Sequence, residues 1–182
     1  MSQFVHLHLH SEYSMVDGIV RIKPLMAACQ QFNISAIAVT DMCNLFAAVK
    51  TYNGALGAGL MPLIAAVLTF LADIEEAYSY QIVALCQNEI GYRHLTELIS
   101  RAYQEGQQKD SLIIKPQWLL EKNEGLIILA GFRSDIAWWL QKSKTEEANV
   151  RLEWWLKHFG DRFYIELSRT NRVKEKEFEV AI

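Results

Sequence analysis

Residues 5–11, VHLHLHS, alternate histidine with apolar side chains near the start of the chain. Successive side chains of a β-strand point to opposite faces, so His6, His8 and His10 are predicted to lie on one face of a strand. Imidazole is the commonest protein ligand for zinc-like metal ions. A polar loop follows, and Asp17-Gly18 is a turn signal that closes it. The pattern predicts a strand whose carboxyl end opens into a site loop, as is usual in α/β folds. The alternative is an edge strand whose histidines face water.

The composition predicts a single globular domain. The chain has 182 residues, of which 51% are hydrophobic and 21% are charged, so it contains enough apolar residues for a core. Its net charge of −3 gives no support for a broadly basic, DNA-binding surface. The three cysteines are scattered without a CxxC pattern, which argues against a zinc knuckle and a disulfide framework. The sequence shows no signal-peptide pattern and no apolar run long enough to span a bilayer, so the expected location is the cytoplasm.

Apolar runs and helical patterns alternate along the chain. Strands are predicted at 4–9, 35–39, 62–71, 80–86, 125–131 and 162–167. Helices are predicted at 19–32, 45–56, 88–105, 115–122, 134–141 and 145–159, and another from residue 173 onward. The acidic segment 73–76 and the polar segment 106–111 are expected to be connections. This order predicts an α/β fold with a parallel sheet and right-handed crossovers, either an open doubly wound sheet or part of a (β/α) barrel.

Three stretches of the chain resemble one known family. They are residues 4–18; residues 36–41 with Asn44-Leu45; and residues 88–92 with Leu95, followed by 125–129. Together they resemble the N-terminal PHP (polymerase and histidinol phosphatase) domain of bacterial replicative DNA polymerase III α subunits. The resemblance implies a distorted (β/α)7 PHP barrel, incomplete at the C-terminus, with about six strands present. It also implies that residues 1–182 are the PHP domain of a much larger polymerase subunit, with the final barrel strand and the polymerase site lying outside this chain.

The resemblance also implies a metal site. In active members of the family, His, Asp and Glu ligands hold several metal ions at the carboxyl ends of the strands and hydrolyse phosphoesters. His8, His10 and Asp17 match ligand positions of the first motif. After the last predicted strand, where further ligands are expected, the chain has Arg169 and Arg172 instead. These arginines are expected to repel cations, and either to hold an anion or to pair with Asp17.

Several of the family's ligand positions carry other residues here. Met42 replaces a histidine of the usual Thr-Asp-His-Gly-Asn motif, Val67 stands where a glutamate is usual, and Gln81 where a histidine is common. A cluster of several metal ions needs anionic oxygens to balance its charge, and a thioether is a poor ligand for Mn²⁺ or Mg²⁺. The expected state is therefore a degenerate site without catalytic residues. His8, His10 and Asp17 are predicted as vestigial ligands, with no cofactor or at most a residual zinc or manganese ion.

Two functions follow from the resemblance. The first is a non-catalytic scaffold of the polymerase III α subunit that docks the proofreading exonuclease subunit, assembles with the remaining polymerase III subunits and meets DNA only through the missing polymerase domains. It has no expected membrane partner. The alternative is a metal-dependent phosphoesterase of the PHP superfamily.

The tryptophan pairs Trp138-Trp139 and Trp154-Trp155 are candidates for an interface, because Trp is enriched at interface hot spots. Adjacent residues of a helix point about 100° apart. One tryptophan of each pair is therefore predicted to pack in the core and the other to lie nearer the surface. The alternative is that both members of a pair pack against the sheet.

Overall fold

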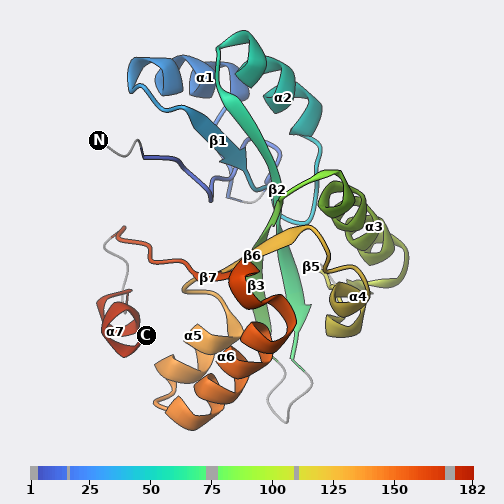
Figure 1. The fold of residues 1–182 in the computed structure, drawn as a ribbon, viewed down its shortest axis with the longest axis vertical. Coiled ribbons are helices and arrows are strands. Elements are labelled where there is room, and N and C mark those ends of the chain that lie inside the picture. Colours follow the sequence, from blue (N-terminus) through green and yellow to red (C-terminus); the bar gives the residue numbers. More distant parts are fainter. Residues whose placement is uncertain (1–3, 16, 73–77, 109–110, 171–174) are drawn as a thin grey trace.

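The chain folds around one mixed β-sheet. The computed structural model describes residues 4–15, 17–72, 78–108, 111–170 and 175–182. Within them, five strands form a sheet in the order β1-β2-β3-β6-β7 (Figure 1). The strands are β1 (Ala36–Val39), β2 (Met61–Leu71), β3 (Ser79–Cys86), β6 (Leu126–Ala130) and β7 (Phe163–Ile165). The α/β class predicted from the sequence is confirmed, and β1 and β7 lie at opposite ends of the sheet order.

One strand runs against the predicted direction. β1 is parallel to β2, and β6 is parallel to β7, but β3 is antiparallel to both β2 and β6. The prediction of an all-parallel sheet is therefore wrong at β3. A parallel return from β2 would need a crossover of about a dozen residues or more, and only residues 72–78 lie between the two strands. β2 and β3 consequently form a hairpin, with Leu71 opposite Ser79.

The histidine-rich segment at the N-terminus is not a regular strand. Ala38 N donates a hydrogen bond to His6 O at 3.0 Å, and Thr40 N donates one to Leu9 O at 2.8 Å. Between these two hydrogen bonds the N-terminal segment advances from His6 to Leu9, whereas the segment that begins in β1 advances only from Ala38 to Thr40. The N-terminal segment therefore carries one extra residue, which interrupts the parallel ladder. Of the strand predicted at 4–9, only the isolated bridge between His6 and Ile37 remains. The strict alternation that placed all three histidines on one face does not hold across this extra residue.

The helices lie where the hydrophobic pattern predicts them, with ends within a turn of those expected. They are α1 (Ile22–Gln31), α2 (Ala48–Gly57), α3 (Glu89–Glu105), α4 (Pro116–Glu121), α5 (Asp135–Gln141), α6 (Thr145–Phe159) and α7 (Glu175–Ala181), with a 3₁₀ turn at Gly160–Arg162. Among the described residues, two N-caps are satisfied by side chains. Asn88 accepts a hydrogen bond from Gly91 N at 3.0 Å, and Ser134 accepts one from Ala137 N at 3.2 Å.

Of the two segments predicted as connections, one contains strand residues and the other lies outside the described residues. The polar segment 106–111 contains part of a small hairpin, in which β4 (Gln107–Gln108) pairs with β5 (Ser111–Leu112). The acidic connection predicted at 73–76 lies outside the described residues.

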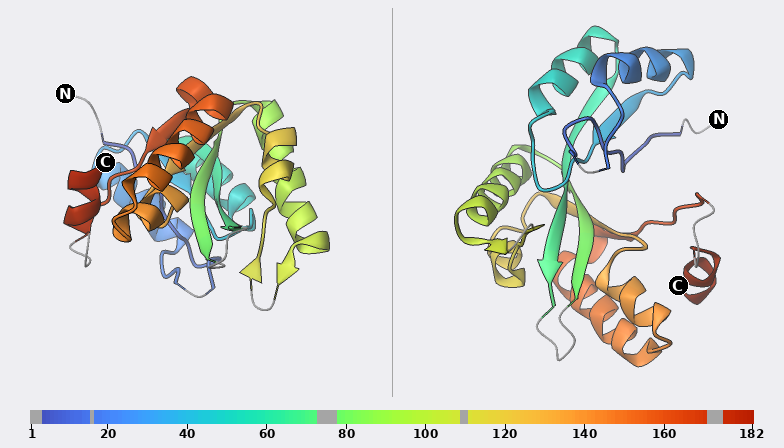
Figure 2. Two further views of the ribbon diagram at one scale, coloured as in Figure 1. Left: turned by 90° about the horizontal axis from the view of Figure 1, so that it is seen from below. Right: turned by 180° about the vertical axis from the view of Figure 1, so that it is seen from behind.

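The core is divided along the sheet. The largest cluster of buried residues lies between the sheet and helices α3 to α6. A second cluster joins α1 and α2 to β1 at the other end of the molecule (Figure 2). In the two tryptophan pairs, Trp155 and Trp139 are buried, whereas Trp154 and Trp138 are only partly buried. The prediction that one member of each pair packs in the core while the other lies nearer the surface is confirmed.

Two tyrosines at the start of β3 lie near a buried ion pair. The carboxylate of Asp135 is fully buried and accepts a hydrogen bond from Arg151 Nε at 2.6 Å and one from Trp155 Nε1 at 3.0 Å. Burial raises the pKa of Tyr78 to about 12 and also raises the pKa of Tyr80, and the negative charge of Asp135 adds to both shifts. These contacts connect α5, α6 and the edge of the hairpin.

The raised pKa values predict a loss of stability at alkaline pH. A tyrosine in the unfolded chain has a pKa of about 10, so the higher folded-state pKa of Tyr78 stabilises the fold in full below pH 10. This contribution is lost as the pH rises from about 10 toward 12, because the unfolded chain then releases protons more readily than the folded one. Chemical denaturation across this pH range measures the effect, and Tyr80→Phe should make the decline shallower. An identical decline in both proteins would contradict the prediction.

Candidate functional site

A cavity of about 430 Å³ opens at the carboxyl ends of β6 and β7 and beside the amino end of β3. It is also lined by the histidine-rich segment and the loop that follows it. Val67 of β2 and Leu129 of β6 contribute apolar surface. Its polar lining consists of His8, His10, Asp17, Gln81, Arg133, Glu166, Ser168, Thr170 and Glu175. The three predicted ligands His8, His10 and Asp17 therefore line one cavity, and His6 is not part of its lining.

Both cavity histidines are paired with a carboxylate. His8 Nδ1 lies 2.9 Å from each carboxylate oxygen of Glu166, and His10 Nδ1 lies 2.9 Å from Asp17 Oδ1. The centroids of the two rings are 5.3 Å apart. A carboxylate accepts the proton of Nδ1–H, which leaves the lone pair on Nε2, and metal-binding histidines are commonly oriented in this way. Nε2 of His10 is buried and has no hydrogen-bond partner within the described residues.

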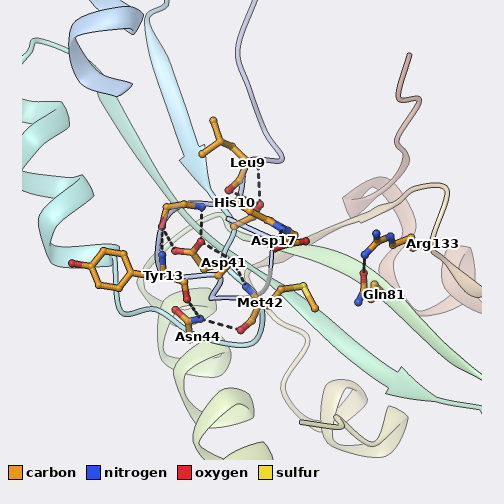
Figure 3. Close-up of polar contacts among 12 residues, drawn as sticks. Leu9, His10, Tyr13, Asp17, Asp41, Met42, Asn44, Gln81 and Arg133 are labelled. Atoms are coloured by element: carbon orange, nitrogen blue, oxygen red, sulfur yellow. Dashed lines mark hydrogen bonds and ion pairs between the residues drawn. The ribbon is translucent and has the colours of Figure 1, made fainter. Parts of the chain in front are cut away.

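A buried aspartate organises the loop that carries these residues. Asp41, which follows β1, is 2% exposed and accepts hydrogen bonds from Ser11 N at 2.7 Å, Ser11 Oγ at 2.7 Å and Ser14 Oγ at 2.9 Å. Ser14 Oγ in turn accepts a hydrogen bond from Met42 N at 3.0 Å. Figure 3 shows Asp41 within this set of contacts. Asp41 does not line the cavity, so its role here is to hold the loop in place.

The loop also depends on a glycine. A Cβ atom on Gly18 would lie 1.7 Å from the carbonyl oxygen of Ser11, so any larger residue would force the two ends of the loop apart. Ser11 is the same residue that donates twice to Asp41. Gly18 and Asp41 together fix the path of the chain between His10 and Asp17.

The strand ends carry few of the ligands that the family resemblance implies. Met42 forms an isolated bridge with Val67, and Val67 places an aliphatic side chain on the cavity. Gln81 Oε1 accepts a hydrogen bond from Arg133 Nη1 at 3.3 Å, and Gln81 N donates one to Arg133 O at 2.9 Å (Figure 3). No signal in the sequence pointed to Arg133 in this cavity, because it follows β6 and belongs to no recognised motif.

Two expectations about the end of the chain are corrected. Arg169 forms an ion pair with Glu179 and not with Asp17, because α7 brings Glu179 beside it. Arg172 lies outside the described residues. The last strand was predicted at 162–167, but β7 ends at Ile165, so Glu166 lies directly after the strand and contacts His8. Its position at a strand's carboxyl end is the one signal that pointed to it.

The donor set does not fit the cluster of several metal ions that the resemblance implies. Val67 has no donor atom, and the side-chain oxygen of Gln81 is engaged by the positively charged Arg133. Across the described ranges, no group of three or more His, Cys, Asp or Glu side chains is arranged to hold a metal ion. The vestigial set of His8, His10 and Asp17 stays a prediction.

Comparison with known proteins identifies the family. The family model described as "PHP domain" matches residues 6–170. The chain belongs to the PHP domain family. Within this family, it is similar to the DNA polymerase III subunit alpha of Pseudomonas fluorescens, with 42% identity over 97% of the chain, and to that of Pseudomonas aeruginosa, with 41% identity over 96%. The corresponding subunit of Escherichia coli K12 is 37% identical over 97% of the chain. The chain spans about 15% of the length of each of these relatives.

A solved structure shares the fold of this PHP domain. It is a protein of Bifidobacterium adolescentis whose name proposes a metal-dependent phosphoesterase. The two structures superpose with a TM-score of 0.59 over 100% of this chain and 83% of the other, at 12% sequence identity. The predicted class, a distorted α/β barrel of the PHP type, is confirmed. None of the helices in the described parts of the chain is long and apolar enough to cross a membrane.

Proposed function

We propose that this chain is the PHP domain of a DNA polymerase III alpha subunit and acts there as a non-catalytic scaffold. In this role it stabilises the polymerase subunit, docks the proofreading exonuclease subunit and belongs to the polymerase III assembly in the cytoplasm. DNA is contacted through other parts of the polymerase. The similarity to polymerase III alpha subunits along nearly the whole chain supports the assignment to this assembly.

The side chains available to bind metal ions in the cavity are the main support for a non-catalytic role. Hydrolysis of a phosphoester by metal ions requires ligands that fix the ions and offset their charge. In this cavity a valine faces the space from β2, and Arg133 engages Gln81 from the end of β6. His8 and His10 each contact a carboxylate of the protein, which ties the N-terminal segment to β7 and to its own loop. The cavity is therefore better suited to holding the domain together than to catalysis.

A metal-dependent phosphoesterase is the second candidate, and one observation favours it. Nε2 of His10 is buried without a partner in the described structure, while its Nδ1 contacts Asp17. This is the orientation expected of a histidine that binds a residual zinc or manganese ion together with His8. Such an ion would act as a Lewis acid and would lower the pKa of bound water.

One pair of measurements separates the two candidates. The 182-residue protein is mixed with the purified proofreading exonuclease subunit of the same polymerase, and the mixture is analysed by size-exclusion chromatography and calorimetry. We expect a 1:1 complex, together with no manganese-dependent release of phosphate from phosphoesters above the level of a His8→Ala control. Failure to form a complex would refute the docking role. Manganese-dependent phosphate release that His8→Ala abolishes would establish the phosphoesterase instead.

A further inference from the structure

We propose that Arg133 is a built-in counter-charge that keeps divalent metal ions out of the cavity. This inference rests on the proposed non-catalytic role of the same site. The cavity is lined by the carboxylates of Asp17, Glu166 and Glu175, a set that by charge alone would attract cations. Among the described residues, Arg133 is the only lysine or arginine in the lining.

The fold holds the Arg133 guanidinium at the cavity through two contacts with β3. Its backbone oxygen accepts a hydrogen bond from Gln81 N at 2.9 Å, which fixes the chain after β6 against the start of β3. Its Nη1 donates to Gln81 Oε1 at 3.3 Å, so the group that receives the guanidinium is a neutral amide. Ser134, the next residue, caps α5 and fixes the far side of the turn. Figure 3 shows Arg133 and Gln81 together, across the site from Asp17 and His10.

The carboxylates of the cavity already have partners supplied by the protein. Glu166 contacts His8, and Asp17 contacts His10. Glu175 accepts hydrogen bonds from Thr170 N at 2.8 Å and Thr170 Oγ1 at 2.5 Å. A divalent ion would have to displace these contacts and would also be repelled by the fixed positive charge of Arg133. Salt screens such a repulsion, so it should weaken as the ionic strength rises.

The test measures binding of Mn²⁺ alone to chelator-treated protein by calorimetry, and the thermal shift that Mn²⁺ causes. Arg133→Gln removes the charge and keeps a polar side chain, and Arg133→Met is a second neutral variant for use if the first does not fold. Arg133→Lys keeps the charge. Arg93→Gln is the matched control, because Arg93 is an exposed arginine of α3 that pairs with Glu89 away from the cavity.

We expect the neutral variants to bind Mn²⁺ about tenfold more tightly than the unchanged protein at low ionic strength, and to gain a larger thermal shift from it. Arg133→Lys and Arg93→Gln should bind like the unchanged protein. If the neutral variants bind Mn²⁺ no more tightly than the unchanged protein, the inference is wrong and the proposed scaffold role is untouched. If the unchanged protein itself binds two or more Mn²⁺ ions tightly, both the inference and the proposed non-catalytic role are overturned.

Discussion

Replacing Asp41 with alanine is expected to lower the free energy of unfolding by about 3 to 5 kcal/mol, because it would leave several buried hydrogen-bond donors without a partner. The carboxylate is 2% exposed and accepts three hydrogen bonds, two from Ser11 and one from Ser14. Hydrogen bonds to a charged group are stronger than those between neutral groups. Their loss would release the loop that positions His10 and Asp17.

Equilibrium unfolding in urea measures this effect, and Asp17→Ala is the matched control. Asp17 is an aspartate of the same loop, but its side chain is 42% exposed and pairs only with His10 among the described residues, so its loss should cost less than about 1 kcal/mol. Asp41→Asn should fall between the two, since the amide oxygen can still accept part of the hydrogen bonding. Equal losses for Asp41→Ala and Asp17→Ala would show that Asp41 does not organise the loop.

Local sequence signals were enough to place the helices. Asn88 and Ser134 cap the helices that begin beside them, and an N-cap involves only residues up to three positions away. The buried runs at β2 and β6 were recognisable for the same reason: each is a short apolar segment bounded by polar or turn residues. The resemblance to the PHP family added the barrel class, which periodicity alone left undecided between two architectures.

The direction and regularity of strands depended on information that is not local. The antiparallel direction of β3 follows from the short connection after β2, and an alternation of strands and helices does not reveal it. The extra residue between His6 and Leu9 appears only in how this segment meets Ala38 and Thr40. A pattern of alternating side chains predicts an ideal strand, and it contains no signal for a bulge imposed by the neighbouring strand.

The candidate site was predictable to the extent that its residues belong to one motif. His8, His10 and Asp17 are close in sequence, and they do line one cavity. Arg133 and Glu166 follow β6 and β7, which are far from the N-terminal motif in the sequence. Their presence in the same cavity could be predicted only with knowledge of the sheet order. The substitutions at Met42 and Val67 identified what the site lacks, but not which protein groups occupy the space instead.

Gly91→Ala is expected to destabilise the domain by about 3 kcal/mol or more, because the added methyl group has no room. A Cβ atom at this position in α3 would lie 1.9 Å from the carbonyl oxygen of Gly125. That oxygen also accepts a hydrogen bond from Gln87 N at 2.8 Å, and Gly91 N itself donates to the cap residue Asn88. Moving α3 away would therefore strain the hydrogen bond between Gln87 N and Gly125 O and loosen the junction between β3 and β6. The clash is with backbone atoms, so no side-chain rotation can relieve it.

Gly57→Ala is the matched control for this prediction, since it makes the same chemical change at another helical glycine. Gly57 is the last residue of α2, and a Cβ atom there would have no neighbour within 4 Å. Alanine is the better helix former, so this variant should be unchanged or more stable by up to about 1 kcal/mol. Thermal unfolding should place the Tm of Gly91→Ala about 6 to 12 °C below that of the unchanged protein, with no such decrease for Gly57→Ala. Similar Tm values for the two variants would mean that α3 can move away from Gly125 at little cost, and that the close packing of this helix on the start of β6 does not hold the domain together.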